Sequence, residues 1–395
     1  MKRTISMLCA VAAVFAAAKV GIAATSADLS PAAQSIAAAN KAIGDKPTEY
    51  AGYNALATAL VRRAQETSDA GFYTQADDAL KKSLELAPNN FETLKIRVSV
   101  LLGEHEYPAA LEAARSLNKR TPDDVMVYGL LTDANVELGS YKEAEDAAQW
   151  MLNLRRGNRP ALIRAGHLRE LFGDAEGAYE LMDLALQSTP RTDTEERAGM
   201  LTEMGHLRLI CGNTDAAEKL LAQALAVRAD YPAALESLAQ VRTARKRYEE
   251  AVTLLVRRYR AVPRAGNLYD LAAALQLAGH DDEAARAFAE FETKGLLESN
   301  KKDNSNRKLV LYYADRAHRP DQALKVAQQE FAWRHDVYTL DAYAWALAAT
   351  GDYEAAREQI RKALEVGIQD PEILSHAAFI ARHYDERKGE LAGTR

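Results

Sequence analysis

The sequence predicts an all-α solenoid of about nine to ten antiparallel helix pairs. Alanine recurs at a nearly constant spacing along most of the chain, and glycine and tyrosine recur at constant offsets from it. Aromatic residues, which favour strands, make up only 7% of the 395 residues. Glycine (21) and proline (11) are too few for a collagen-like or low-complexity chain.

One column of alanines sets the repeat, with successive members 33, 34 or 39 residues apart. The alanines are Ala76, Ala110, Ala144, Ala178, Ala217, Ala251, Ala284, Ala323 and Ala356. A tyrosine stands three residues before five of them, at Tyr73, Tyr107, Tyr141, Tyr248 and Tyr353. A glycine stands five residues before six of them, at Gly71, Gly139, Gly173, Gly212, Gly279 and Gly351. Several columns that keep one register over nine units indicate a repeat array.

Each unit is predicted to form a helix, a tight turn and a second helix, as residues 124–154 illustrate. Val127, Leu130 and Ala134 are apolar at helical spacing, and Gly139 follows at the expected helix exit. Glycine suits that exit because it accepts a positive φ without a Cβ clash. The alanine column is expected where two helices approach too closely for a larger side chain.

This pattern resembles the tetratricopeptide repeat over essentially the whole chain after residue 23, most clearly in Phe91–Pro122 and Val337–Ile368. The resemblance implies a right-handed superhelical solenoid whose first helices line an inner surface, where ligands of the family usually bind. The last unit, with Trp345, Gly351 and Pro371, is similar to the ending of a group of exported bacterial repeat proteins.

The expected organisation has six parts. They are a signal peptide (1–23), an N-terminal capping helix (24–46), units one to seven (47–298), a polar insert (299–307), units eight and nine (308–370), and a C-terminal capping helix with a charged tail (371–395). Residues 56–66 are expected in an overlong helix, and the C-terminal helix is expected to end near His383. The unit around Ala323 lacks both its glycine and its tyrosine.

The first residues have the layout of a cleaved signal peptide. Lys2 and Arg3 precede an apolar stretch at 5–18, and small residues at 21–23 suit cleavage after Ala23, with 16–18 as a second possible site. An uncleaved membrane anchor is the alternative, although about 14 apolar residues are short of the roughly 20 that span a bilayer. We therefore expect a periplasmic or secreted protein with no membrane span in the mature chain.

Cleavage would remove three basic residues and no acid, which changes the net charge from −6 to −9. This sign argues against general nucleic-acid binding. Cys211 would be the only cysteine left, so we predict no intramolecular disulfide and expect Cys211 to be a small buried residue. The basic stretch Arg242–Arg264 suits either an anionic partner or a solvated outer helix face.

Two histidines are the first candidate site residues. His167 and His206 lie in identical Gly-His-Leu-Arg segments of adjacent units, with Glu170 and Glu203 nearby. They suggest either a metal or proton-relay site, or a relic of unit duplication. We predict histidines that line a groove and contact a partner, with no metal and no cofactor.

The second candidate is an aromatic and acidic set on or beside the first helices towards the C-terminus. It comprises Tyr269, Asp270, Tyr312, Asp315, Tyr338, Asp341 and Trp345. Tyr and Trp are enriched where a partner segment is gripped. The alternative is that some of these rings pack between helices.

These observations predict a non-catalytic scaffold that binds a protein or peptide segment along its inner surface. The motifs of zinc proteases (HExxH), nucleophile elbows (GxSxG), P-loops and dinucleotide folds (GxGxxG) do not occur. A metal-binding or catalytic protein using His167 and His206, and a holdase-type chaperone, are the alternatives. The sequence specifies neither the partner nor the oligomeric state.

Overall fold

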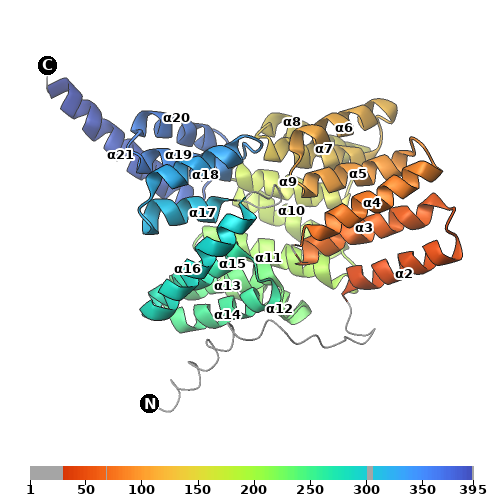
Figure 1. The fold of residues 1–395 in the computed structure, drawn as a ribbon, viewed down its shortest axis with the longest axis horizontal. Helices are drawn as coiled ribbons and strands as arrows, with labels where there is room; N and C mark the ends of the chain where they lie inside the picture. The colour runs from red at the N-terminus through yellow and green to blue at the C-terminus, as the bar shows by residue number, and fades with distance from the viewer. Residues whose placement is uncertain (1–29, 68, 300–305, 394–395) are drawn as a thin grey trace, which may run out of the picture. The chain divides into compact units, whose positions relative to one another are not determined.

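The structure is a computed structural model that describes residues 30–67, 69–299 and 306–393 (Figure 1). Over these ranges the chain is helical and contains no strand, so the predicted all-α class is confirmed. None of the helices in these ranges has the length and apolarity needed to cross a membrane. The predicted signal peptide and most of the polar insert lie outside the described residues.

The chain divides into two compact units, each formed from two separate stretches of sequence. Unit 1 contains residues up to Val100 together with Ala229–Phe291. Unit 2 contains Leu101–Arg228 together with the chain from Glu292 onward.

Unit 1 consists of helix pairs in the predicted register. Its helices are α2 (Pro31–Asp45), α3 (Tyr50–Thr67), α4 (Gly71–Leu86), most of α5 (Phe91–Gly103), α13 (Pro232–Ala244), α14 (Tyr248–Ala261), α15 (Ala265–Leu277) and most of α16 (Asp281–Glu298). Helix α3 has 18 residues, against 13 in α5, which confirms the expected overlong helix. The Ser83 and Thr93 hydroxyls donate to the buried Asn54 Oδ1 at 2.7 and 3.0 Å. These bonds connect α3, α4 and α5.

Unit 2 continues the helix pairs up to α12 and resumes after the polar insert. Its helices are α6 (Tyr107–Arg120), α7 (Val125–Glu137), α8 (Tyr141–Leu154), α9 (Arg159–Leu171), α10 (Ala175–Ser188), α11 (Thr194–Ile210), α12 (Thr214–Val227), α17 (Arg307–Leu311), the π-helix η1 (Tyr312–Arg316), α18 (Pro320–Phe331), α19 (Val337–Ala349), α20 (Tyr353–Leu364) and α21 (Pro371–Gly393).

The alanine column packs as expected, because all nine alanines are between 0 and 3% exposed. The turn column also holds. Five of the six glycines have φ between 71 and 83°, and the exception, Gly71, lies at the start of α4. In the three units without the glycine, His105, Lys246 and His318 occupy its place at φ of 59, 58 and 50°. The turn therefore keeps its left-handed residue even where that residue carries a side chain.

The structure departs from the sequence predictions at three places. The first helix of the Ala323 unit is short and ends in η1, in which the Ala317 amide bonds the Tyr312 carbonyl at 2.9 Å. Helix α21 continues past His383 to Gly393, because residues 384–392 contain no proline to stop it. Cys211 is exposed rather than buried, since it caps α11 at the turn instead of facing the next helix.

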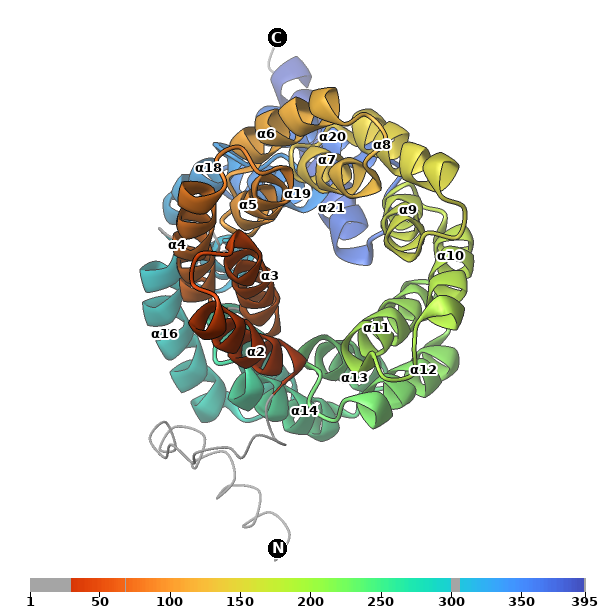
Figure 2. The ribbon, with the colours of Figure 1, turned by 90° about the vertical axis from the view of Figure 1, so that its right-hand side faces the viewer.

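The C-terminal helices of unit 2 pack against helices far away in sequence. One apolar cluster joins Ala144 and Leu168, on α8 and α9, to Val337, Leu340 and Ala344 on α19. Figure 2 shows α19–α21, in blue, behind α7 and α8. Repeat arrays normally bury each unit only against its neighbours, so this long-range packing is an additional feature of the fold.

Candidate ligand-binding pocket

A pocket of about 560 Å³ opens in unit 2, where the segment before α19 meets α7–α9. Its lining combines apolar side chains with a larger number of polar and charged ones. The apolar residues are Val136, Leu171, Val310, Ala327, Val337 and Ala342. The polar residues are Glu137, Tyr141, His167, Glu170, Glu203, His206, Arg307, Glu330, Arg334, Asp336, Tyr338 and Thr339.

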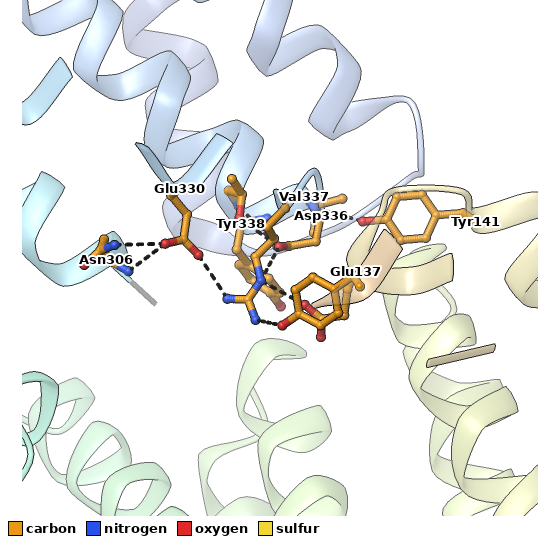
Figure 3. A network of polar contacts seen from close by, with 10 residues as sticks. Glu137, Tyr141, Asn306, Glu330, Asp336, Val337 and Tyr338 are labelled. Atoms are coloured by element: carbon orange, nitrogen blue, oxygen red, sulfur yellow. Dashed lines mark hydrogen bonds and ion pairs between the residues drawn. The ribbon is translucent and has the colours of Figure 1, made fainter. Parts of the chain in front are cut away.

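Arg334 is the centre of a buried ionic network on one wall of the pocket. Figure 3 shows the carboxylates of Glu137, Glu330 and Asp336 that belong to this network. Its Nε lies 2.9 Å from a Glu137 carboxylate oxygen and 3.5 Å from Asp336, and its Nη1 lies 3.3 Å from Glu330. The third guanidinium nitrogen, Nη2, donates to the Tyr107 hydroxyl. One cation therefore contacts three carboxylates, on α7, on α18 and at the start of α19.

Burial dominates the electrostatics of this wall. It raises the pKa of Glu137 and of Glu330 above their ordinary value, although the attraction of Arg334 opposes the rise. The carboxylates thus depend on the guanidinium to remain charged away from water.

Backbone hydrogen bonds place this wall against α7 and α8. The His335 amide donates to the Glu137 carbonyl at 3.0 Å, and the Val337 amide donates to the Tyr141 hydroxyl at 2.8 Å. Asp336 caps α19 by accepting from the Tyr338 and Thr339 amides. The tyrosine column of the repeat thereby acquires a second role, since Tyr107 and Tyr141 both hold the distant C-terminal segment.

The opposite wall carries a histidine and carboxylate cluster from α9 and α11. One donor atom each of His167, Glu170 and Glu203 lies within 4.8 Å of the other two. His206 Nε2 lies 3.2 Å from Glu170 Oε1. Burial alone would lower the pKa of His206, but the bond to Glu170 and the nearby Glu203 outweigh burial and raise it.

The identical Gly-His segments have a packing reason. A Cβ on Gly166 would lie 2.9 Å from Met182 Cε, and one on Gly205 would lie 2.8 Å from Leu221 Cγ. The glycines let the second helix of each pair approach the first. The next residue along each helix is the histidine, which lines the pocket.

One helix pair of the chain matches a known family model. The model described as tetratricopeptide repeat matches residues 338–366, which span α19 and α20. This helix pair is therefore a tetratricopeptide repeat, and the preceding helix pairs share its register of alanine and turn residues.

Solved structures with similar folds share little sequence with this chain. One is the APC/C hetero-tetramer Cut9–Hcn1, with 14% identity, a TM-score of 0.47, and coverage of 82% of this chain and 55% of that one. A tetratricopeptide repeat protein from Parabacteroides merdae has 16% identity, a TM-score of 0.44, and coverage of 60 and 93%. The human IFIT1 dimer with m7Gppp-AAAA has 13% identity, a TM-score of 0.49, and coverage of 86 and 96%.

This chain therefore spans about half of the Cut9–Hcn1 chain. A search of curated proteins finds no match. None of these TM-scores reaches 0.5, so the similarities carry no argument about ligands.

In the repeat register, most of the polar lining residues lie on first helices, namely α7, α9, α11 and α19. Of the nine residues that the sequence suggests for partner contact, His167, His206 and Tyr338 line this pocket. The Arg307 guanidinium lies over the Tyr338 ring, 5.3 Å from its centre.

Asp341 is fully buried behind the pocket, so its side chain forms no part of the surface. Its carboxylate contacts Arg307 at 3.1 Å and His376 Nδ1 at 2.8 Å. Trp345 stacks on the His376 ring with 4.1 Å between ring centres and donates its indole N–H to Asp315 at 2.7 Å. These residues hold α21 and η1 against α19.

The other three suggested residues are also engaged within their own units. Tyr312, 9% exposed, donates to Glu292 at 3.2 Å in unit 2. Tyr269 packs edge-on against Phe288 and Phe291 in unit 1. Asp270 accepts from Arg258 at 2.7 Å. Most of the aromatic and acidic set therefore packs or pairs within the protein and does not line the pocket.

The basic stretch Arg242–Arg264 is extensively paired in unit 1. Arg242 and Arg247 contact Glu250, Arg257 contacts Asp230, and Arg258 contacts both Glu236 and Asp270. Much of its positive charge is neutralised within the protein.

Sequence reasoning missed the Arg334 wall. Glu137, Glu330 and Asp336 stand near turns and share no column. Glu330 and Asp336 lie within four residues of Arg334, whereas Glu137 comes from a distant repeat, so no repeat period relates it to Arg334. The available signal was the tyrosine column, since its hydroxyls need partners when buried.

Proposed function

We propose that this tetratricopeptide-repeat protein is a non-catalytic scaffold that holds a segment of a partner protein in the unit 2 pocket. The pocket itself carries the proposal. Its volume of about 560 Å³ lies within the roughly 300–1,000 Å³ typical of ligand sites. Its mixed apolar and polar lining suits a short segment with one or two apolar side chains and a hydrogen-bonding backbone.

The wall around Arg334 supports specific binding because it is preorganised. Arg334 is fixed by three carboxylates and a tyrosine, so binding a segment there would cost little side-chain ordering. Tyr338 adds an aromatic ring to the pocket lining.

Selection from a displayed heptapeptide library, followed by site-specific photocrosslinking, tests this proposal. A photoreactive phenylalanine analogue at Tyr338 should capture the selected peptide. The same analogue at Trp150, which is 53% exposed on the second helix α8, is the matched control. Equal capture at both positions, or no selected peptide, would refute binding in the pocket.

A holdase-type chaperone makes a different prediction for the same protein. It would suppress the aggregation of several unrelated unfolded proteins at similar stoichiometry. We expect no such broad suppression from a scaffold that recognises one kind of segment, and finding it would favour the chaperone.

We further propose that the protein is exported with cleavage after Ala23. The support is the basic, apolar and small-residue order of the first 23 residues. Mass spectrometry of the protein recovered from fractionated cells tests this, and a mature chain that retains residues 1–23 would contradict it.

A further inference from the structure

We propose that His167, Glu170 and Glu203 form a binding site for one divalent transition-metal ion, with zinc as the best match. The structure brings together what the sequence left uncertain, namely that both carboxylates lie beside the same imidazole. One donor atom from each of the three residues lies within 4.8 Å of the others.

Helix geometry explains the convergence. His167 and Glu170 are three residues apart on α9 and so share one face. Glu203 reaches the same point from α11, the first helix of the next repeat. Rigid helices from adjacent repeats thus supply all three donors.

The spacing is close to that of a bound ion. Zinc binds nitrogen and oxygen at about 2.0–2.2 Å, which places tetrahedral donors about 3.4 Å apart. Donors that are at most 4.8 Å apart therefore need to close by about 1 Å or slightly more, which rotation about glutamate side-chain bonds provides.

Two of the three donors are not held by a hydrogen bond or ion pair within the described ranges, although the Glu203 carboxylate also attracts His206. Neither His167 nor Glu203 makes a hydrogen bond or ion pair with any residue that the structure describes. Both nevertheless line the pocket. By contrast, the carboxylates of the opposite wall are all committed to Arg334.

His206 supplies a positioning contact. Its Nε2 lies 3.2 Å from Glu170 Oε1 and orients that carboxylate towards His167. Histidine and carboxylate partners behind a ligand are common in metal sites, and their loss typically weakens binding about 10–100-fold.

The donor chemistry selects the class of ion. One imidazole and two carboxylates suit Zn²⁺ and its neighbours in the first transition row, whereas Ca²⁺ and Mg²⁺ prefer oxygen ligands throughout. Two carboxylates provide two negative charges to balance those of the ion. Three protein ligands leave a coordination position open towards the pocket.

The test is calorimetric titration of Zn²⁺ into the mature chain, made without a polyhistidine tag and stripped with a chelator. Titration with Co²⁺, followed by its visible absorption, reports the coordination geometry. We expect one ion per chain and a tetrahedral Co²⁺ spectrum. His167→Ala and Glu203→Gln should each abolish binding, and His206→Ala should weaken it about 10–100-fold while His206→Gln restores it.

His280 provides the matched control, because its Nε2 lies 3.0 Å from Glu249 in unit 1. His280→Ala should leave zinc binding unchanged. Circular dichroism in the absence of metal shows whether each variant is folded. Absence of binding by the folded native chain, or binding that survives His167→Ala, would overturn the site. The peptide experiment, run in chelator, tests the scaffold proposal separately.

Discussion

Gly139→Ala is predicted to loosen the Arg334 wall of the pocket. Gly139 has φ of 71°, and a Cβ there would lie 2.6 Å from the carbonyl oxygen of His335. Gly212 occupies the equivalent turn two units later with φ of 76°, and a Cβ there would meet nothing within 4 Å. The two substitutions therefore share the backbone strain and differ in the clash.

The strain common to both is about 1–2 kcal/mol for a non-glycine residue in the left-handed region. A gain of about 0.4–1 kcal/mol from the less flexible unfolded chain partly offsets it, which leaves about 1 kcal/mol for Gly212→Ala.

Gly139→Ala carries a further cost. A Cβ contact below 3.0 Å is not tolerated, so the His335 carbonyl must move by at least 0.4 Å, from 2.6 to 3.0 Å. That motion strains the hydrogen bond between the His335 amide and Glu137, and overpacking of this kind costs about 1–3 kcal/mol. We expect a total loss of about 2–4 kcal/mol.

Urea unfolding followed by circular dichroism measures the two losses, and hydrogen exchange locates them. Exchange should rise in residues 320–349 for Gly139→Ala and remain unchanged there for Gly212→Ala. Hydrogen exchange is needed because repeat arrays do not always unfold in one step. Equal losses in the two variants would refute the close approach of His335 to the α7–α8 turn.

Three further predictions concern single charges and turns. Arg334→Met should destabilise the protein by about 3–5 kcal/mol in urea melts because it leaves buried carboxylates unpaired. The same substitution at Arg155, whose side chain is exposed, should cost under about 0.5 kcal/mol. Similar losses of stability in the two variants would contradict the network. Lys246→Gly should stabilise by about 0.5–1 kcal/mol, since it relieves a left-handed φ of 58°, and a loss of stability would contradict that reasoning. The Arg319 guanidinium lowers the pKa of Glu292 below its ordinary 4.5, so the carboxylate stabilises the fold above that pH and the contribution is lost as pH falls through the folded-state pKa. Carboxyl NMR should show the Glu292 pKa rise in Arg319→Gln, and an unchanged pKa would contradict the pairing.

The repeat architecture could be predicted because its causes are local. The alanine column marks contacts between neighbouring helices, and the turn column marks a left-handed residue, so each is visible within one 34-residue period. Positions 105, 246 and 318 carry a larger residue in place of the glycine, yet each still adopts the left-handed conformation of the turn.

The pocket was only half predictable, for the opposite reason. The wall with His167 and His206 lies within adjacent repeats, and identical segments indicated it. The wall with Arg334 depends on a contact between Glu137 and the segment before α19, which no repeat period encodes. The aromatic set was found in sequence, but Trp345 and Tyr312 are engaged by Asp315 and Glu292, partners that columns alone do not reveal.

The bond between Tyr141 and Val337 has a consequence for the order of synthesis and folding. The two residues are 196 positions apart, so at roughly 5–20 residues per second the ribosome needs about 10–40 s between them. During that interval the faces of Ala144 and Leu168 that α19 later covers remain exposed on the nascent chain. The first repeats of unit 2 therefore cannot bury these faces until α19 has been synthesised. A ribosome that stalls late in translation would leave an exposed, aggregation-prone apolar face that chaperones must cover.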